Sequence, residues 1–325
     1  MGDKKRDHLL PDLWSTLFLV TPVISTTFAS VEKMFGKLPI ETFGWLLVDE
    51  AGQAVPQAAV GAIMRSKRAM IVGDPLQIEP VVTLQPTLVN AICREYGVEP
   101  EEWSAPKSSA QYLADTASPY GGELQKEFGE MWIGSPLLVH RRCDNPMFKI
   151  SNCVAYDGLM VHGKTFKSSP IREVLGPSKW IDVRGSGNTK WCSTSGREAL
   201  QLLYQLKEIG LSSPDVYIIS PFRVVMQEMR KAVTKQRELL DGWPDDWVTE
   251  RIGTVHTFQG KESEAVIFLL GAPDESQKGA RAWAGSSPNI LNVAATRAKS
   301  CLYVIGNRDL WKEHGSFKEL DRHLR

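Results

Sequence analysis

Short apolar runs recur along the chain, and each one ends in polar or glycine residues. They span residues 17–20, 45–48, 69–72, 216–219, 265–270 and 301–305. Continuous apolar runs of this length are typical of strands buried on both faces, as in a parallel sheet covered by helices. Helix-length segments lie between or beside them, at residues 56–66, 197–209 and 224–240. The alternation predicts an α/β fold.

The length and the central region predict two domains. The chain has 325 residues, more than one small core requires. Residues 97–129 contain three prolines and a Gly-Gly pair without a strong strand pattern, and strand-like sequence resumes at residues 133–139. We therefore expect two α/β units, at residues 1–130 and 131–325.

Composition limits the classes of partner and compartment. Lysine plus arginine equals aspartate plus glutamate, 38 each, so a nucleic acid would need a local channel rather than a basic surface. Five cysteines without a C-x-x-C pair favour a reducing, cytoplasmic location and argue against a zinc site or a disulfide framework. No apolar run approaches the ~18 residues that a bilayer span requires. The charged N-terminus also lacks the apolar core of a secretory signal.

One segment imitates a phosphate-binding loop. Gly158 and Gly163-Lys164-Thr165 match the pattern G-x-x-x-x-G-K-[ST]. A working loop needs a buried strand before it, small residues within it and a helix after it. Here no apolar strand precedes the loop, bulky residues fill it, and Pro170 interrupts the exit. We interpret this segment as a surface connection.

The segment WLLVDEAGQA carries a stronger chemical pattern. Four apolar residues lead into Asp49 and Glu50, so two carboxylates follow a buried strand. Open α/β sheets bind ligands at the carboxyl ends of their strands. Asp49 could hold Mg²⁺ through water, and Glu50 could polarise an attacking water. The alternative is an acidic strand end that faces solvent.

A second strand end repeats the arrangement. AMIVGDPLQIEP delivers Gly73, Asp74 and Gln77 after an apolar run. A right-handed strand–helix–strand crossover would bring this end beside the Asp49–Glu50 pair. The amide of Gln77 could contact a phosphate oxygen or orient water.

The second half of the chain supplies matching groups. A polar loop with Gln259, Gly260 and Glu262 precedes a buried strand, and a helix that starts at a Ser-Pro pair ends at Thr296-Arg297. We expect Arg297 to have nothing local to pair with. A planar cation of this kind suits the charge that spreads over a γ-phosphate during phosphoryl transfer, whereas the alternative role is a surface salt bridge.

These segments together resemble a known family. In order, DEAGQA, GDPLQIEP, HRRCDNPMF, SPFR, GTVHTFQGKE and LNVAATRAK resemble motifs II, III, IIIa, IV, V and VI of superfamily-1 helicases. The branch that contains the nonsense-decay and DNA-replication helicase-nucleases is the most similar, and the resemblance covers residues 17 to 310. It implies two RecA-like parallel-sheet domains of the P-loop NTPase fold, ATP and Mg²⁺ as cofactors, and single-stranded DNA or RNA as partner.

The resemblance also implies residue roles. Asp49 and Glu50 would serve Mg²⁺ and water activation, Gln77 would couple the γ-phosphate to nucleic acid, and Arg142 and Arg297 would be arginine fingers. The nucleotide site would further include Asp74, Gln259, Gly260 and, near the ribose, Glu262. Thr26, Thr27 and Thr257 would contact the nucleic-acid backbone, because hydroxyls bind phosphate without reading sequence. For Thr26 and Thr27 a role as strand-end caps remains the alternative.

The sequence departs from the family in one respect. Members carry a phosphate loop upstream of the DEAG segment, and residues 1–48 contain no such pattern. We therefore expect the C-terminal portion of a longer helicase, with a first domain incomplete at its N-terminus and an apolar edge beside residues 69–72. We expect such a chain not to hydrolyse ATP without the upstream portion, supplied in cis or in trans. The alternatives are a non-catalytic nucleic-acid-binding remnant and a small NTPase that uses Lys164.

Overall fold

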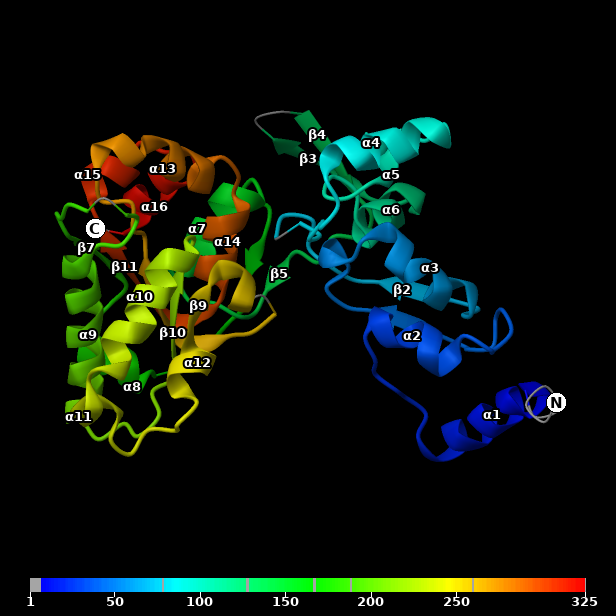
Figure 1. Cartoon of the computed structure of the whole chain (residues 1–325), viewed down its shortest axis with the longest axis horizontal. Coiled ribbons are helices and arrows are strands. Elements are labelled where there is room, and N and C mark those ends of the chain that lie inside the picture. The colour runs from blue at the N-terminus through cyan, green and yellow to red at the C-terminus, as the bar shows by residue number, and fades with distance from the viewer. Residues whose placement is uncertain are drawn as a thin grey trace. The chain divides into compact units, whose positions relative to one another are not determined.

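A computed structural model describes residues 7–77, 79–126, 129–165, 168–187, 189–258 and 260–324. The chain divides into two compact units (Figure 1). The first consists of Met1–Pro75, Glu79–Glu123 and Glu130–Pro136, and the second of Leu76–Ile78, Leu124–Gly129 and Leu137–Arg325. Leu76 and Gln77 thus pack as part of the second unit, although they directly follow a strand end of the first.

The first unit combines a two-stranded sheet with short helices. Its elements are η1 (Asp7–Leu9), α1 (Leu10–Val20), α2 (Phe28–Phe35), β1 (Leu46–Val48), η2 (Ala51–Gln53), α3 (Pro56–Met64), β2 (Ala69–Ile71), α4 (Pro86–Glu95), α5 (Pro100–Trp103) and α6 (Ala110–Ala117). A separate pair, β3 (Gly122–Lys126) and β4 (Gly129–Ile133), follows. The predicted strands at 45–48 and 69–72 and the predicted helix at 56–66 are therefore present.

The sheet of the first unit has one covered face and one exposed face. β1 and β2 are parallel, with Leu47 opposite Met70. Val48 is buried together with Ala59 of α3 and Ala110 of α6, and Leu46 and Ile71 pack against this cluster. On the other face, Leu47 is 66% exposed and Met70 is 49% exposed. Apolar side chains on both faces of a strand are buried only if other elements pack on both faces. In β1 and β2 other elements pack on one face.

The run at residues 17–20 is a correction to the sequence prediction. It forms the end of helix α1, not a strand, and Leu19 and Val20 are more than 80% exposed. The run continues a helical pattern in which Trp14 contacts Phe18 at a ring separation of 5.9 Å. A four-residue apolar run has no periodicity that separates helix from strand, and this one belongs to the longer helical segment.

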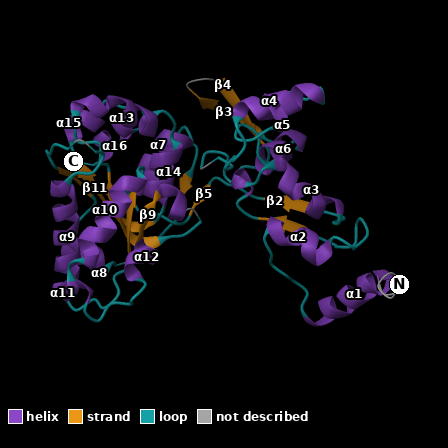
Figure 2. Cartoon of the chain, viewed as in Figure 1, coloured by secondary structure: helices purple, strands orange, loops and turns teal. Residues whose placement is uncertain are grey.

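The second unit is larger and is built around a five-stranded sheet (Figure 2). Its elements are β5 (Val139–His140), α7 (Met147–Ala155), β6 (Val161–His162), α8 (Pro170–Leu175), β7 (Lys179–Asp182), α9 (Ser193–Glu208), β8 (Val216–Ser220), α10 (Arg223–Thr234), α11 (Arg237–Leu240), α12 (Trp247–Arg251), β9 (Ile252–Thr254), η3 (Val255–Phe258), β10 (Ser263–Leu269), η4 (Glu275–Gln277), α13 (Lys278–Gly285), α14 (Asn289–Thr296), β11 (Ala298–Gly306), α15 (Arg308–Trp311) and α16 (Phe317–His323).

All strand pairs of this sheet are parallel, in the order β7-β11-β10-β8-β9. Every residue of β8 is buried, and in β10 and β11 the central residues Ile267 and Tyr303 lie opposite each other with no exposed surface. Side chains on both faces are therefore covered, as expected of a parallel sheet between helices. The predicted α/β class is confirmed. No helix in the described ranges has both the length and the apolar content to cross a bilayer.

Candidate functional site

The two carboxylates of the first unit lie directly after β1. Asp49 is exposed, and its Oδ1 accepts a hydrogen bond of 2.9 Å from the backbone N–H of Glu50. Glu50 adopts the left-handed conformation, with φ 53° and ψ 37°, and caps the short helix η2. Its Oε2 accepts from Nε2 of Gln53 at 2.9 Å. A non-glycine residue in this conformation is strained unless its surroundings hold it, and such residues concentrate at functional sites.

The two strand ends of the first unit meet, as the crossover argument expects. The N–H of Ala51 donates to the carbonyl of Val72 at 3.0 Å. A Cβ atom at Gly52 would lie 2.6 Å from the carbonyl oxygen of Asp74, and one at Gly73 would lie 2.6 Å from the nitrogen of Gly52. Both positions require glycine because the two backbones touch. Asp49, Glu50 and Asp74 therefore share one edge of the sheet.

A buried glutamine packs against the backbone of this edge, and it was not predicted from the sequence. Gln111 of α6 is 7% exposed, and its Nε2 donates to Oδ1 of Asp115 at 3.0 Å. Its Oε1 is buried, has no hydrogen-bond partner among the described residues, and would lie 3.1 Å from a Cβ at Gly73. Asp115 also accepts from the N–H of Gly134 at 3.0 Å. Gln111 lies in the first turn of the short helix α6, and nothing in the surrounding sequence distinguishes it from an exposed polar residue.

Arg297 occupies the interior of the second unit. It has no exposed surface, and its Nη1 donates to the carbonyls of Lys261 at 2.9 Å and Phe258 at 3.4 Å. Its Nη2 lies 3.5 Å from Oε1 of Gln77 and 3.3 Å from Oγ1 of Thr296. The expectation that Arg297 has nothing local to pair with is wrong, and so is the alternative of a surface salt bridge. Backbone carbonyls hold this cation in position.

Two asparagines of α14 hold the segment that contains Gln77. Asn292 is fully buried, and its Nδ2 donates to the carbonyl of Leu76 at 3.1 Å. Asn289 donates to the carbonyl of Gln77. The sequence analysis did not single out either residue, although a polar side chain inside the apolar helix NILNVAAT was a signal, because a buried amide needs partners.

The second predicted arginine lies in a charged network at the surface. Nε of Arg142 is 3.1 Å from Oε2 of Glu262, and Nζ of Lys299 is 3.5 Å from Oε1 of the same residue. Lys299 also approaches Asp215, which binds Arg251 at 2.6 Å. The side chains of Arg142 and Glu262 are more than a third exposed, so their pair contributes little to stability. It does fix the position of the Arg142 guanidinium beside the residue that the resemblance assigns to the ribose.

The remaining predicted residues lie in loops. Gly260 is exposed in a left-handed turn with φ 76°, whereas Gln259 falls outside the described residues. Thr257 is exposed, and its Oγ1 is 3.1 Å from Oγ1 of Thr254.

Thr26 and Thr27 precede the helix α2, so the alternative of strand-end caps is wrong. Thr27 is the N-cap residue of that helix without a capping side-chain bond. Both threonines are exposed; Oγ1 of Thr26 lies 3.4 Å from Sδ of Met34, and Oγ1 of Thr27 lies 3.4 Å from Oγ of Ser30.

The imitation phosphate loop has a structural role. Nζ of Lys164 is 3.0 Å from Oδ1 of Asp144 and donates to the carbonyl of Lys299 at 2.6 Å. The two charged side chains are 12% and 5% exposed. The strand before Lys164 is the two-residue β6, which pairs with β5. Lys164 therefore forms an internal ion pair. The prediction of a surface connection holds for Leu159 and Val161, which are exposed, but not for Lys164.

A histidine beside Arg142 is held neutral. Nε2 of His140 accepts from the N–H of Cys143 at 2.9 Å, so the ring carries its proton on Nδ1. Burial, together with the positive charges of Arg142, His162 and Lys164, lowers the pKa of His140 to about 4. Burial also raises the pKa of the Cys143 thiol to about 12, so this cysteine is not a nucleophile.

Comparison with known proteins identifies related sequences. A model of an AAA domain family (AAA_12) matches residues 132–309, and a second AAA domain model (AAA_11) matches residues 15–85. Helicase SEN1 of Saccharomyces cerevisiae is 24% identical over 315 residues, which cover 90% of this chain and 12% of SEN1. RNA helicase Mov10l1 of Mus musculus is 24% identical over 297 residues, which cover 82% of this chain and 23% of that protein.

A third relative is the DNA replication ATP-dependent helicase/nuclease DNA2 of Gallus gallus. It is 22% identical over 319 residues, which cover 95% of this chain and 27% of DNA2. The chain therefore spans from 12% to 27% of the length of these three relatives.

Proposed function

Because the chain belongs to the AAA_12 family of AAA domains, we propose that it is the C-terminal part of an ATP-dependent superfamily-1 helicase that moves on single-stranded nucleic acid. The names of its relatives support a helicase function. One observation carries the proposal furthest: Arg297 is buried against backbone carbonyls and approaches Gln77, the polar residue that follows the Asp74 turn. A remnant without catalysis has no physical need to bury a cation beside this amide.

The carboxylate edge of the first unit fits Mg²⁺ and ATP. Asp49 offers an exposed carboxylate at a strand end, and oxygen donors of this kind suit Mg²⁺, which retains several of its waters. Glu50 is held by its backbone conformation and by Gln53, so it can accept a proton from an attacking water in one fixed orientation. Bound Mg²⁺ would supply charge neutralisation at the phosphates.

We further propose that the phosphate-binding loop comes from polypeptide outside this sequence, in cis or in trans. Lys164 is already paired with Asp144, and residues 1–48 carry no glycine-rich phosphate pattern. The uncovered face of β1 and β2, with Leu47 and Met70, would pack against that additional polypeptide.

The test compares ATP hydrolysis by this chain alone with hydrolysis after fusion to the upstream segment of its natural reading frame. Single-stranded RNA and single-stranded DNA are added in separate arms to decide between the two partners. We expect no hydrolysis by the chain alone and nucleic-acid-stimulated hydrolysis by the fusion. Arg297→Ala should reduce the stimulated rate by about 10³-fold or more, as removal of an arginine finger does.

Glu50→Gln should have a comparable effect, whereas Glu41→Gln in the same unit should have none. Nucleic-acid binding without hydrolysis by the fusion would support the non-catalytic alternative. Hydrolysis by the chain alone that is lost in Lys164→Ala would support the small NTPase.

A further inference from the structure

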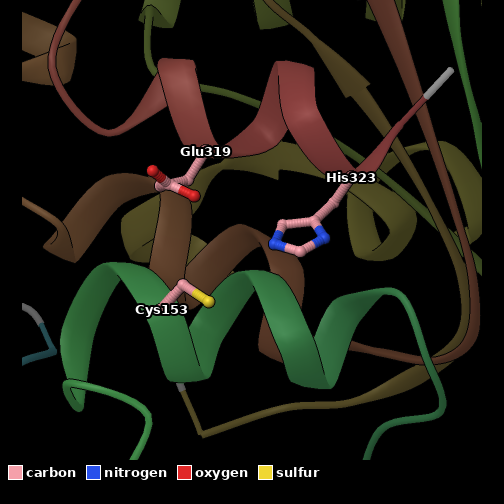
Figure 3. Close-up of side chains that lie close together, drawn as sticks. All are labelled: Cys153, Glu319 and His323. Atoms are coloured by element: carbon pink, nitrogen blue, oxygen red, sulfur yellow. The ribbon is translucent and has the colours of Figure 1, made fainter.

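Three side chains from two helices converge at a surface of the second unit. Cys153 lies on α7, and Glu319 and His323 lie on α16 (Figure 3). One ligand atom from each, Sγ, a carboxylate oxygen and an imidazole nitrogen, lies within 4.8 Å of the other two. Cys153 is more than 160 positions from the other two residues, so the sequence contains no C-x-x-C or H-x-x-x-H spacing at this site.

The geometry of α16 brings two of the three to the same side. Glu319 and His323 are four residues apart, and residues at this spacing lie on one face of a helix. Phe317 and Leu320 of the same helix are fully buried and fix which face points outward. Arg308 binds Asp321 at 2.6 Å and ties α16 to α15 as well. Both side chains therefore project from a rigid element, as a preorganised site requires.

The donor set is chemically specific. Zn²⁺ accepts thiolate sulfur, imidazole nitrogen and carboxylate oxygen at about 2.0–2.3 Å in a tetrahedral arrangement, so small rotamer adjustments would close the observed separations. Hard cations such as Mg²⁺ and Ca²⁺ prefer all-oxygen sites. Three protein ligands would leave one position open, as in zinc sites that keep an exchangeable ligand.

The surroundings also suit a cation. Cys153 is exposed and Glu319 and His323 are half-buried, so a metal ion can enter from solvent. One oxygen of Glu319 accepts from Nη1 of Arg322, and a carboxylate oriented in this way can use its other oxygen for a metal.

We propose that Cys153, Glu319 and His323 form a Zn²⁺ site that links α16 to α7. The site shares no residue with the carboxylate edge or with the contacts of Arg297, so it does not depend on the proposed helicase function. A metal bound across two packed helices stabilises the folded state of the second unit, because the unfolded chain does not bring the three ligands together.

Titration of the metal-stripped, reduced 325-residue chain with Co²⁺, followed by displacement with Zn²⁺, tests the proposal. We expect one Co²⁺ per chain, a thiolate-to-cobalt charge-transfer band in the near ultraviolet, and a rise in melting temperature when Zn²⁺ is added. Cys153→Ser should abolish the band. His323→Gln should weaken Zn²⁺ binding by more than the 10- to 100-fold cost that is typical of outer-shell partners.

Matched controls come from the same region. His314→Gln and Glu313→Gln precede α16 and should bind Zn²⁺ as the unaltered chain does. Far-UV circular dichroism of each metal-free variant verifies that it is folded. If Cys153→Ser is not folded, Glu319→Gln replaces it in the test, and we expect an intermediate loss of Zn²⁺ affinity. A charge-transfer band that persists in Cys153→Ser, an affinity unchanged in His323→Gln, or the lack of saturable binding would overturn the proposal.

Discussion

The two units contain similar apolar runs but give them different surroundings. In the second unit, β8 is buried along its whole length, and eight of the nine residues of β11 are buried. In the first unit, β1 and β2 form a sheet of two strands in which Leu47 and Met70 remain exposed. Full burial of a side chain of this size is worth about 1.5–3 kcal/mol, so the first unit forgoes a large part of the stabilisation that its sequence offers.

The difference shows that an apolar run can specify a strand, whereas other elements must supply the side chains that bury its two faces. The second unit provides parallel neighbours and helices for both faces of its strands within residues 137–324. The first unit covers one face with α3 and α6 and leaves the other to solvent. The largest stability effects should therefore arise from the second unit, and the largest dependence on added polypeptide from the first.

The largest expected effect is a difference in thermal unfolding between fragments that contain one unit each. A fragment of residues 137–325 should unfold in one cooperative thermal transition, because it retains the five-stranded sheet and its core. A fragment of residues 1–136 should show no cooperative transition, because two strands with one covered face are marginal in water. Far-UV circular dichroism during heating measures both. A cooperative, high-temperature melt of the monomeric N-terminal fragment would contradict the comparison.

The next effect concerns the ion pair of Lys164. Lys164→Ala should destabilise the chain by about 3 kcal/mol, because it leaves the buried carboxylate of Asp144 without its cation. Urea denaturation measures the change, and Lys149→Ala, which removes an exposed lysine from α7, is the control. Lys164→Ala combined with Asp144→Asn should recover part of the loss. Unchanged stability in Lys164→Ala would show that the pair does not form.

The buried amide of Asn292 should have a somewhat smaller effect. Asn292→Ala should cost about 2 kcal/mol, because it removes bonds to Ser151, Tyr156 and Leu76 in the interior. Asn289→Ala, at a half-buried position, should cost less. In the 137–325 fragment, which lacks Leu76, the cost of Asn292→Ala should fall by about 1 kcal/mol. Equal costs in fragment and full chain would mean that Asn292 does not hold the 76–77 segment in solution.

Adjacent residues of β1 distinguish the two faces of its sheet. Val48→Thr should destabilise the first unit by about 1–2 kcal/mol, because the hydroxyl enters the buried cluster. Leu47→Thr should leave stability unchanged and reduce aggregation, because that side chain is exposed. Hydrogen exchange of the Ala51 and Val72 amides, both bonded within this sheet, reports the difference. Equal loss of protection in both variants would contradict the one-sided cover.

The last effect, which is absent at neutral pH, is a pH dependence from His140. Its pKa falls from 6.5 in the unfolded chain to about 4 in the folded chain. The unfolded state therefore binds a proton that the folded state does not, so the stability contribution is complete above pH 6.5 and is lost as the pH falls toward 4. His140→Gln should flatten this part of the curve of unfolding free energy against pH. Identical slopes in the two proteins between pH 7 and pH 5 would contradict the neutral ring.

The sequence by itself determined the α/β class and five of the described strands, β1, β2, β8, β10 and β11, because continuous apolar runs of this length are typical of strands in a parallel sheet. It also determined that Asp49 and Asp74 would approach each other, since the handedness of a strand–helix–strand crossover is nearly fixed. The flanking residues also favour a connection over a phosphate-binding loop at residues 158–165, and this stays a prediction.

Tertiary structure decided the features that depend on long-range packing. Arg297 gained carbonyl partners from residues 258 and 261. Asn292 reaches Leu76 across more than 200 positions, and Cys153 meets His323 across 170. Local sequence cannot predict contacts between residues so far apart in the chain. Such contacts form when whole helices and strands pack together, and they do not depend on the residues adjacent in sequence.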